Sequence, residues 1–290
     1  MLLISAALAD TIRVPSDYAT VAEAVNYASI TNGPDEIVVS SAYTPAAKAV
    51  DVKDQTLTFV GDGASYQLEP LFGEGATLAI SDASFTVVDD WDGSPFSLTS
   101  PCSLCIRLGS VTLYNVDFQG AQGYGIIVVD TDLFATDLSM TGGRDGRSLA
   151  SVALTDSVVL ELTTSVFEGN VGGAVKLYGD YGYQVQATLD TVDFVNNFAS
   201  EGASIYARNT ELQVFGGLQS GNVSRSSSPL DLEGTIATFD GVQFDGNTGS
   251  EGNVIKANMN AGGVSIKGGT IQNGRGTFGD VVAGGGGMLS

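Results

Sequence analysis

The stretch Leu160–Tyr178, LELTTSVFEGNVGGAVKLY, decides the fold of this 290-residue chain. An alternating apolar segment ends at Phe167, a Glu-Gly-Asn turn follows, and a second apolar segment begins at Ala174. The same unit recurs as Ala187–Ala207 and Ala237–Ala257. A unit that recurs along a chain indicates a repeat architecture, in which each copy forms one layer of a stack.

The first half of the unit can be followed through most of the chain as an eight-residue signature. Its copies end at Phe85, Phe118, Met140, Phe167, Phe194, Leu218, Phe244 and Ile271, with steps of 22 to 27 residues and one step of 33. Alternation with period 2 predicts a strand with one face inward. Neither two-residue turns nor helical segments join the copies, which excludes hairpins and βαβ units. Each copy is therefore predicted to begin a coil that returns to the same place one layer higher.

The second half of the unit predicts two more interior columns. Their residues are Val175, Ile205, Leu230 and Ile255, and two places later Leu177, Ala207, Leu232 and Ala257. The residues between them are predicted to point outward as a stripe: Lys176, Tyr206, Asp231 and Lys256. A further column follows the strand ends: Asn170, Asn197, Asn222 and Asn247. Because asparagine tolerates left-handed backbone and can bond the backbone of its neighbours, this column is predicted to be a ladder of turns and not a binding site.

Residues 10–63 have a different pattern. Thr20 and Glu23 fit a capping box at the start of a helix predicted over Val21–Ser29. Short strands are predicted at Thr11–Val14, Glu36–Val39 and Gln55–Val60. The helix can cover the apolar interior and the unpaired edge of the first coil.

This first segment resembles the N-terminal part of pectate-lyase-like right-handed parallel β-helix proteins, in which such a helix caps the stack. The resembling stretches are Ile12–Pro15, Tyr18–Val25, Asp35–Val39 and Leu57–Gly61. The repeats, over about a third of the chain, are similar to the FxxN and GGAI-type repeats of polymorphic outer-membrane proteins, although Gly-Gly-Ala is intact only at 172–174. We therefore expect an all-β chain, a right-handed parallel β-helix of about ten coils with an N-terminal capping helix.

The chain divides into four predicted parts. Residues 1–9 look like a signal-peptide remnant, because Ala7-Leu8-Ala9 is a small-x-small cleavage pattern. Residues 10–63 form the cap and first coil, 64–278 the β-helix coils, and 279–290 a glycine-rich tail or the start of a linker. An uncapped solenoid end is an exposed edge, so further chain or a partner is expected beyond the C-terminal end. No stretch has the roughly 18 apolar residues of a membrane span.

The composition is acidic, with 12 Lys and Arg against 33 Asp and Glu, a net charge of −21 and no His. Such a surface repels phosphate backbones and anionic lipids, which argues against nucleic-acid and electrostatic membrane partners. It suits a secreted or cell-surface protein, such as one of the bacterial outer membrane or extracellular space. The absence of histidine removes the commonest general base and metal ligand.

Cys102 and Cys105, in PCSLC, are the two cysteines of the chain. A zinc site would need two more ligands, and no third Cys or His is present. A redox motif usually accompanies a βαβ pattern, which is missing. A short disulfide that staples a loop of an exported chain is favoured.

The loop Asp89–Gly93 places three carboxylates, Asp89, Asp90 and Asp92, around the one tryptophan, Trp91. It could bind Ca²⁺, stack a sugar on Trp91 or hydrolyse a glycosidic bond. Its spacing matches no complete calcium loop, so a solvated acidic turn is favoured and Ca²⁺ is the one cofactor considered.

Two other polar segments are weaker candidates. Asp130-Thr131-Asp132 could bind Ca²⁺ or a sugar, as proposed for the acidic loop. Arg144-Asp145-Gly146-Arg147 could bind the carboxylate of a substrate through its arginines. Both are interpreted first as polar turns.

Motifs of the β-helix polysaccharide enzymes are missing, including Gly-His-Gly and Gln-Asp-Thr-Leu. We therefore expect an exported, non-catalytic surface or secreted protein with a structural or adhesive role. It would bind an extracellular glycan or surface protein through Trp91 and the stripe of Lys176, Tyr206, Asp231 and Lys256.

The alternative is a lyase or glycoside hydrolase acting on acidic polysaccharide. Its site would draw on Asp89, Asp90, Asp92, Lys176 and Arg208. Two or three carboxylates converging near Lys176 or Arg208 would rule out the non-catalytic role, whereas a smooth outer face with isolated acids would rule out the enzyme.

Overall fold

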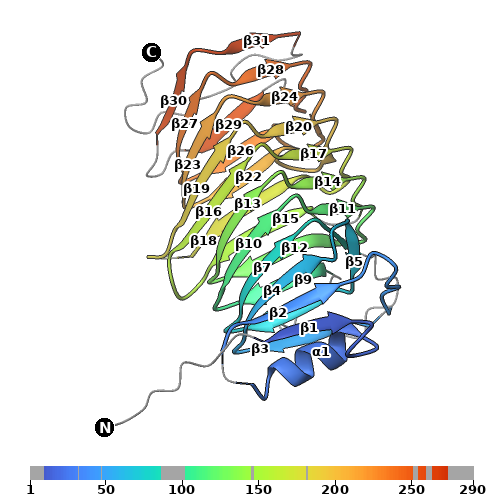
Figure 1. Ribbon diagram of the computed structural model, residues 1–290. Helices are drawn as coiled ribbons and strands as arrows, with labels where there is room; N and C mark the ends of the chain where they lie inside the picture. Colours follow the sequence, from blue (N-terminus) through green and yellow to red (C-terminus); the bar gives the residue numbers. More distant parts are fainter. Residues whose placement is uncertain are drawn as a thin grey trace.

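The protein is a stack of coils in which each coil adds one strand to each of three parallel sheets (Figure 1). The computed structural model describes residues 10–31, 33–46, 48–85, 102–144, 147–180, 182–250, 254–258 and 263–273. Within these residues, sheet A has eleven strands and sheets B and C have nine each. The predicted right-handed parallel β-helix is confirmed, with nine coils that contribute to all three sheets where about ten were expected.

Sheet A consists of β1 (Thr11–Val14), β2 (Asp35–Val39), β4 (Thr56–Gly61), β7 (Thr77–Ser81), β10 (Ser110–Tyr114), β13 (Asp132–Thr136), β16 (Val158–Thr163), β19 (Val185–Asp190), β23 (Thr210–Phe215), β27 (Ile236–Asp240) and β30 (Val264–Lys267). Sheet B consists of β3 (Val50–Lys53), β6 (Leu71–Glu74), β9 (Cys102–Arg107), β12 (Tyr124–Val129), β15 (Leu149–Ala153), β18 (Val175–Gly179), β22 (Ile205–Arg208), β26 (Leu230–Glu233) and β29 (Ile255–Asn258). Sheet C consists of β5 (Tyr66–Leu68), β8 (Ala83–Phe85), β11 (Asp117–Gln119), β14 (Ser139–Thr141), β17 (Val166–Glu168), β20 (Asp193–Val195), β24 (Leu218–Ser220), β28 (Gln243–Asp245) and β31 (Thr270–Gln272). A two-stranded sheet, β21 (Phe198–Ala199) with β25 (Val223–Ser224), lies at the corner between sheets C and B.

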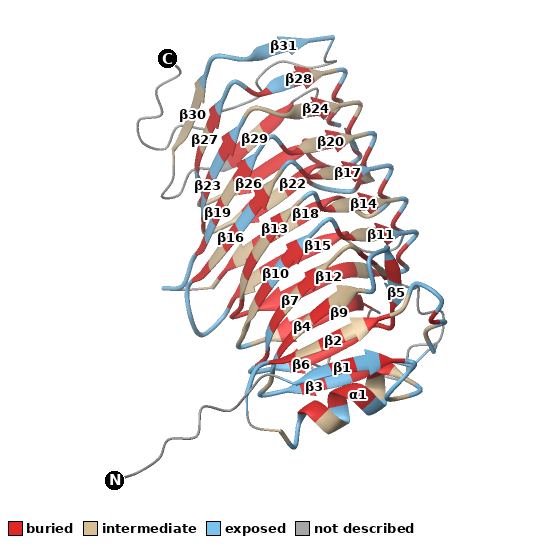
Figure 2. Ribbon diagram, in the orientation of Figure 1, coloured by how far each residue is buried: buried red, intermediate tan, exposed pale blue. Residues whose placement is uncertain are grey.

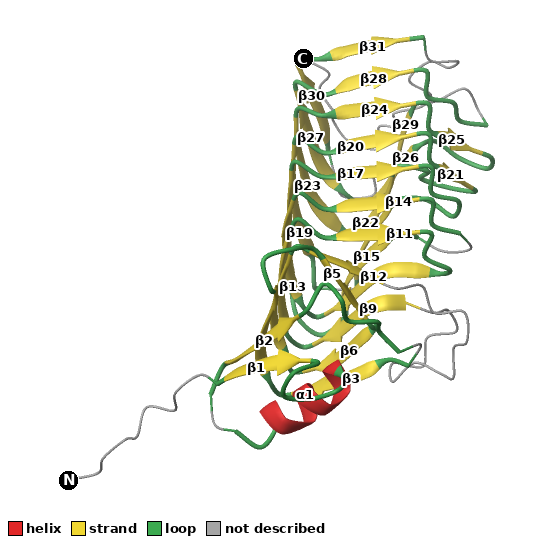
Figure 3. Ribbon diagram, turned by 45° about the vertical axis from the view of Figure 1, so that its right-hand side comes forward, coloured by secondary structure: helices red, strands yellow, loops and turns green. Residues whose placement is uncertain are grey.

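The capping helix α1 (Val21–Ala28) lies against the first strands at the N-terminal end of the stack (Figures 1 and 3). Thr20 Oγ1 accepts a hydrogen bond from the Glu23 N–H at 3.2 Å, as the capping box predicted. The apolar stripe of the helix is buried, so the helix covers the interior of the first coils.

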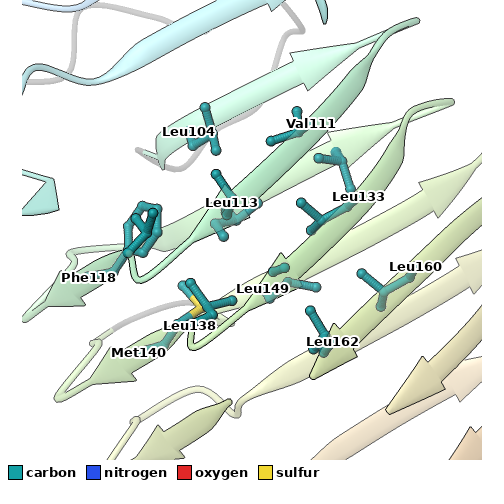
Figure 4. Packing of buried hydrophobic residues seen from close by; sticks show 14 of the residues in the cluster. Leu104, Val111, Leu113, Phe118, Leu133, Leu138, Met140, Leu149, Leu160 and Leu162 are labelled. Carbon is teal, nitrogen blue, oxygen red and sulfur yellow. The ribbon is translucent and has the colours of Figure 1, made fainter. Parts of the chain in front are cut away.

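The interior is filled by columns of apolar side chains that repeat from coil to coil. Burial alternates along the strands (Figure 2), and leucines from sheets A and B meet Phe118 and Met140 of sheet C (Figure 4). The rings of Phe85 and Phe118 stack with their centroids 4.6 Å apart, and those of Phe167 and Phe194 at 5.2 Å. Stacking therefore buries the inner face of each coil against its neighbours.

One position of the predicted interior ladder was wrong. Phe194 pairs with Gln219, and Gln219 pairs with Phe244, so Gln219 and not Leu218 occupies the ladder. The alternation of apolar residues predicted Leu218 at this position. Because this coil has the same strand and corner lengths as its neighbours, Gln219 lies there instead. Ile271 is in register with Phe244 yet 42% exposed, because it belongs to the last described coil.

The predicted asparagine ladder is present, and its asparagines bond the backbone of neighbouring coils, as Asn197 Nδ2 does to the Phe167 carbonyl at 2.9 Å. The residues with positive φ are those just before the asparagines: Gly169, Asn196, Gly221 and Gly246. The asparagines themselves are buried, and the amide Nδ2 of each of the first three donates to the Oδ1 of the next asparagine at 2.9 to 3.0 Å. The column is an internal hydrogen-bonded ladder that joins successive coils.

Candidate functional site

The acidic loop with Asp89, Asp90, Trp91 and Asp92 lies outside the described residues. Among the residues that are described, no group of three or more His, Cys, Asp or Glu could hold a metal ion. The calcium and tryptophan predictions therefore remain predictions.

The two cysteines form a disulfide within strand β9, so they do not staple a loop. Both are buried in an apolar cluster on the outer side of sheet B, whose other buried members are Phe72, Ile127, Val129 and Ala150. The N-terminal half of this outer side thus has a buried apolar patch, beside which Asp51, Lys53 and Glu74 are exposed.

In its C-terminal half, the outer side of sheet B carries charged and tyrosine side chains. Lys176, Tyr206, Asp231 and Lys256 lie in register on β18, β22, β26 and β29, as the predicted stripe requires. A second column lies two places further along the same strands: Tyr178, Arg208 and Glu233. This column was not predicted as a unit, although its spacing from the first column follows from the same alternation of the strand.

Positive charge is concentrated on this outer side. Counting Arg147 at its edge, it carries six of the twelve Lys and Arg residues of the chain: Lys53, Arg107, Arg147, Lys176, Arg208 and Lys256. With Glu201 counted at the same edge, it carries five of the 33 acids: Asp51, Glu74, Glu201, Asp231 and Glu233. A protein of net charge −21 therefore has one sheet face where cations outnumber acids. The name cationic face is used below for Arg147, Lys176, Tyr178, Tyr206, Arg208 and Lys256.

Arg147 is the most firmly held cation of this face. Its guanidinium donates hydrogen bonds to the backbone carbonyls of Glu201 and Gly202, and its Cζ lies 5.5 Å from the centroid of the Tyr206 ring. Burial lowers the pKa of Arg147, but a guanidinium stays charged at neutral pH. The sequence analysis treated this arginine as part of a polar turn, because a contact across 55 residues leaves no local signal.

Gly173 provides the space that the Arg147 guanidinium occupies. A Cβ on Gly173 would lie 2.5 Å from Arg147 Nη1, and the glycine has φ of +106°, which side chains rarely adopt. The position of the Arg147 guanidinium therefore accounts for the second glycine of the intact Gly-Gly-Ala motif at 172–174.

We expect Gly173→Ala to displace the guanidinium and to lower the free energy of unfolding by about 1 to 3 kcal/mol, through steric clash and backbone strain. Urea denaturation followed by circular dichroism measures the loss. Gly63→Ala is a matched control, because Gly63 has a similar φ of +102° but its added Cβ would meet nothing within 4 Å. Equal losses in the two variants would show that the Arg147 contact contributes nothing.

Lys176 and Arg208 flank one aromatic ring. Lys176 Nζ lies 6.0 Å and Arg208 Cζ 5.5 Å from the centroid of Tyr178. Burial lowers the pKa of Lys176, and the positive charge of Arg147 lowers it further. The face therefore holds cations that are partly withdrawn from water.

Two carboxylates lie beside these cations. Glu233 Oε2 is 3.8 Å from Arg208 Nε and accepts a hydrogen bond from Tyr206 Oη at 3.3 Å. Asp231 is only 5% exposed and accepts a hydrogen bond from Ser227 Oγ at 2.6 Å. Burial raises the pKa of Asp231, whereas the Ser227 hydrogen bond and Lys256 oppose the rise. The described contacts therefore place one carboxylate, that of Glu233, beside Arg208, whereas Asp231 interacts with Ser227 and Lys256; the convergence of two or three carboxylates that the enzymatic alternative requires is not seen among the described residues.

The phenol of Tyr206 lies between the acidic and the basic groups. Burial, and then the neighbouring Glu233 carboxylate, raises the pKa of Tyr206 to about 12. At neutral pH this tyrosine is therefore a neutral hydrogen-bond donor.

The corner with β21 and β25 borders the cationic face (Figure 3). Arg225 Cζ lies 4.7 Å from the centroid of the Phe198 ring there. The loops that follow these two strands supply Gly202, which holds Arg147, and Ser227, which holds Asp231. The face is thus built by sheet B and by the corner loops together.

The side chains of Asp130 and Asp132 accept hydrogen bonds from backbone N–H groups. Asp130 Oδ1 accepts hydrogen bonds from the N–H groups of Leu154, Thr155 and Asp156 at 2.6 to 3.3 Å. Asp132 Oδ1 accepts one from the Val159 N–H at 2.8 Å. These contacts support the interpretation of this segment as a structural turn.

The chain is similar in fold to a pectate lyase. That enzyme, from Bacillus sp. N165 and solved in complex with trigalacturonate, matches with a TM-score of 0.49 and 11% identity, over 97% of this chain and 88% of that one. A protein of Geobacillus virus E2, ORF18, matches with a TM-score of 0.44 and 12% identity, over 89% of this chain and 61% of that one. No family model matches the chain, and no curated protein matches it. These matches assign no role to any residue, and the β-helix itself is established by the three parallel sheets.

Among the described residues, no helix is long and apolar enough to cross a membrane.

Proposed function

We propose that this protein is an exported, non-catalytic β-helix protein with a structural or adhesive role, and that its cationic face binds an anionic glycan. The observation that carries the proposal is the concentration of six of twelve cations on one sheet face of a chain with net charge −21. Self-repulsion and solubility do not require such a concentration, whereas an anionic ligand does.

The chemistry of the face suits a polymer of acidic sugars. Guanidinium and ammonium groups donate to carboxylate or sulfate oxygens, and Tyr178 and Tyr206 add aromatic surface and hydroxyl groups. Neighbouring strands of sheet B are about 4.8 Å apart, so an extended chain can meet a polar group on each successive coil. Residues on four successive strands would contribute: Lys176, Tyr206, Asp231 and Lys256.

Export is supported by two properties of the chain. A disulfide joins Cys102 to Cys105, and disulfides persist mainly in oxidising compartments such as the cell surface or the extracellular space. The acidic composition also suits an extracellular surface.

The test measures binding of polygalacturonate, alginate and a neutral polysaccharide to the immobilised protein over a range of salt concentrations. We expect the anionic polymers to bind with salt-dependent affinity and the double variant Lys176→Gln/Arg208→Gln to bind at least about tenfold more weakly, since each charged hydrogen bond contributes about 1.5 to 3 kcal/mol. Lys48→Gln/Lys267→Gln is the matched control, because both lysines are exposed and lie off this face. Equal affinity for the neutral polymer, or equal losses in the two double variants, would refute the proposal.

A second candidate function is a lyase or hydrolase acting on acidic polysaccharide. The observation that favours it is the proximity of Asp231 and Glu233 to Arg208 and Lys256. Product release from polygalacturonate and alginate, with and without Ca²⁺, decides between the two. Turnover by the wild type that is lost in Lys176→Gln would contradict the non-catalytic proposal and support an enzyme with its site on the cationic face. Turnover lost in Asp90→Ala/Asp92→Ala would move the site to the acidic loop and support calcium.

A further inference from the structure

We propose that the protein has a second carbohydrate site, for a neutral sugar, at the corner between sheets A and C near the N-terminal end of the stack. A hollow of about 550 Å³ lies there, lined by residues 60, 61 and 63–65 and by Ser81 and Asp82. Its volume falls within the range of about 300–1,000 Å³ that is typical of small-molecule sites. The name corner hollow is used below for this space, which shares no residue with the cationic face.

The corner hollow exists because one corner of the stack is longer than those that follow it. Four residues, 62–65, join β4 to β5, whereas Asp82 alone joins β7 to β8 and two residues join β10 to β11. The long corner folds back on itself, since a Cβ on Gly61 would overlap the Ala64 carbonyl oxygen. Gly61 is therefore required for this turn, and the extra residues leave space against the next coil.

Asp82 gives the corner hollow a fixed hydrogen-bond acceptor. Its N–H donates to the Tyr114 carbonyl at 3.0 Å, and its own carbonyl accepts from the Tyr66 N–H at 3.3 Å. Its Oδ1 accepts from Asn115 Nδ2 at 2.8 Å, while Oδ2 has no hydrogen bond to any described residue. A carboxylate that is already held in place can accept from a sugar hydroxyl at little cost in ordering entropy. The hydroxyl of Ser81 can both donate and accept beside it.

The surroundings of the corner hollow favour an uncharged ligand. The outward residues of the two nearest strands, β7 and β10, carry no charge: Thr77, Ala79, Ser81, Ser110, Thr112 and Tyr114. Asp82 is the one charged residue in the lining, so an anionic sugar would be repelled. Hydroxyl groups that bind one another and the carboxylate are the chemistry of a neutral sugar.

Tyr114 adds an aromatic surface next to the corner hollow. It lies in register with Ser81 on the neighbouring strand and is 53% exposed. A tyrosine ring has an apolar body and a polar tip, so it can pack against the C–H groups of a sugar ring while its hydroxyl stays in water.

The experiment follows the backbone amide resonances of the ¹⁵N-labelled protein during titration with cellobiose, lactose and mannobiose, and separately with digalacturonate. We expect at least one neutral disaccharide to shift the amides of Ser65, Ser81 and Asp82 with a Kd of about 1 to 10 mM. This Kd should not change when the salt concentration is raised about tenfold, because the ligand carries no charge. Digalacturonate should leave these amides unshifted.

The double variant Ser81→Leu/Asp82→Asn fills part of the corner hollow and removes the carboxylate. We expect it to bind the disaccharide at least about fivefold more weakly, since a charged hydrogen bond is lost. The fold should be retained, because asparagine tolerates the positive φ of +57° and can still accept from Asn115.

The matched control is Thr136→Leu/Asp137→Asn, which should bind as the wild type does. Thr136 lies in register with Tyr114, and so in the column of Ser81 two coils further on, and Asp137 has a φ of +55° at the equivalent corner. Three results would overturn the inference: no shift with any of the three neutral disaccharides, equal weakening in the two double variants, or binding that disappears as salt rises.

The outcome is separate from that of the proposed function. The corner hollow binds without Lys176 or Arg208, so the variant Lys176→Gln/Arg208→Gln should leave disaccharide binding unchanged. Its affinity is expected to lie below that of the cationic face for an anionic polymer, where several charged hydrogen bonds act together. Failure of either binding test therefore leaves the other standing.

Discussion

Replacing Asn222 by alanine is expected to lower the free energy of unfolding by about 3 kcal/mol or more, because several buried hydrogen bonds are lost together. Asn222 Oδ1 accepts from the backbone N–H and the amide Nδ2 of Asn197, both at 3.0 Å. Its Nδ2 donates to the Phe194 carbonyl at 2.8 Å and to Asn247 Oδ1 at 3.0 Å. Alanine would leave the Phe194 carbonyl and the Asn197 N–H buried without partners, at about 1 to 3 kcal/mol each.

The free energies of unfolding of wild type and variant, from urea denaturation followed by circular dichroism, provide the measurement. Asn26→Ala is a suitable control, since Asn26 lies on the exposed side of helix α1 and alanine favours a helix. A loss below about 1 kcal/mol in Asn222→Ala would mean that the asparagine ladder contributes little to the stack.

Gln219→Leu is expected to have the opposite effect and to raise the free energy of unfolding by about 1 to 3 kcal/mol. Gln219 is buried in the ladder between Phe194 and Phe244, and neither Nε2 nor Oε1 of its amide has a hydrogen-bond partner in the described structure. Leucine is apolar and of similar size, so it would remove the desolvation penalty without opening a large cavity.

The same denaturation assay tests this stabilisation. Gln213→Leu provides the control, because Gln213 is exposed on sheet A and a surface substitution should change stability by no more than about 0.5 kcal/mol. A loss of stability in Gln219→Leu would contradict the expectation and would indicate an internal water that satisfies the amide.

Together the two substitutions separate two kinds of buried amide. Asn222 and Gln219 lie three residues apart and both are fully buried, yet one is hydrogen-bonded at both ends and the other at neither. The difference depends on what the coils above and below present at each position, and composition does not reveal it.

The sequence by itself determined the stack, its cap and the first outward column. Alternation with period 2 decides which residues of a strand face inward, and recurrence of the unit places equivalent residues above one another. Lys176, Tyr206 and Asp231 could therefore be predicted to lie in one column, as they do. The capping box at Thr20 was equally local, because its hydrogen bond joins residues three apart.

Only the tertiary structure decided how that column becomes a site. Arg147 reaches a carbonyl 55 residues away across Gly173, and Glu233 pairs with an arginine from the preceding coil. Such contacts depend on the exact length of each coil, since one residue more or less would turn side chains to the opposite face. For the same reason Gln219, and not the apolar Leu218, entered the interior ladder. Sequence patterns predict which face a residue occupies, whereas the register between coils decides which neighbours it meets there.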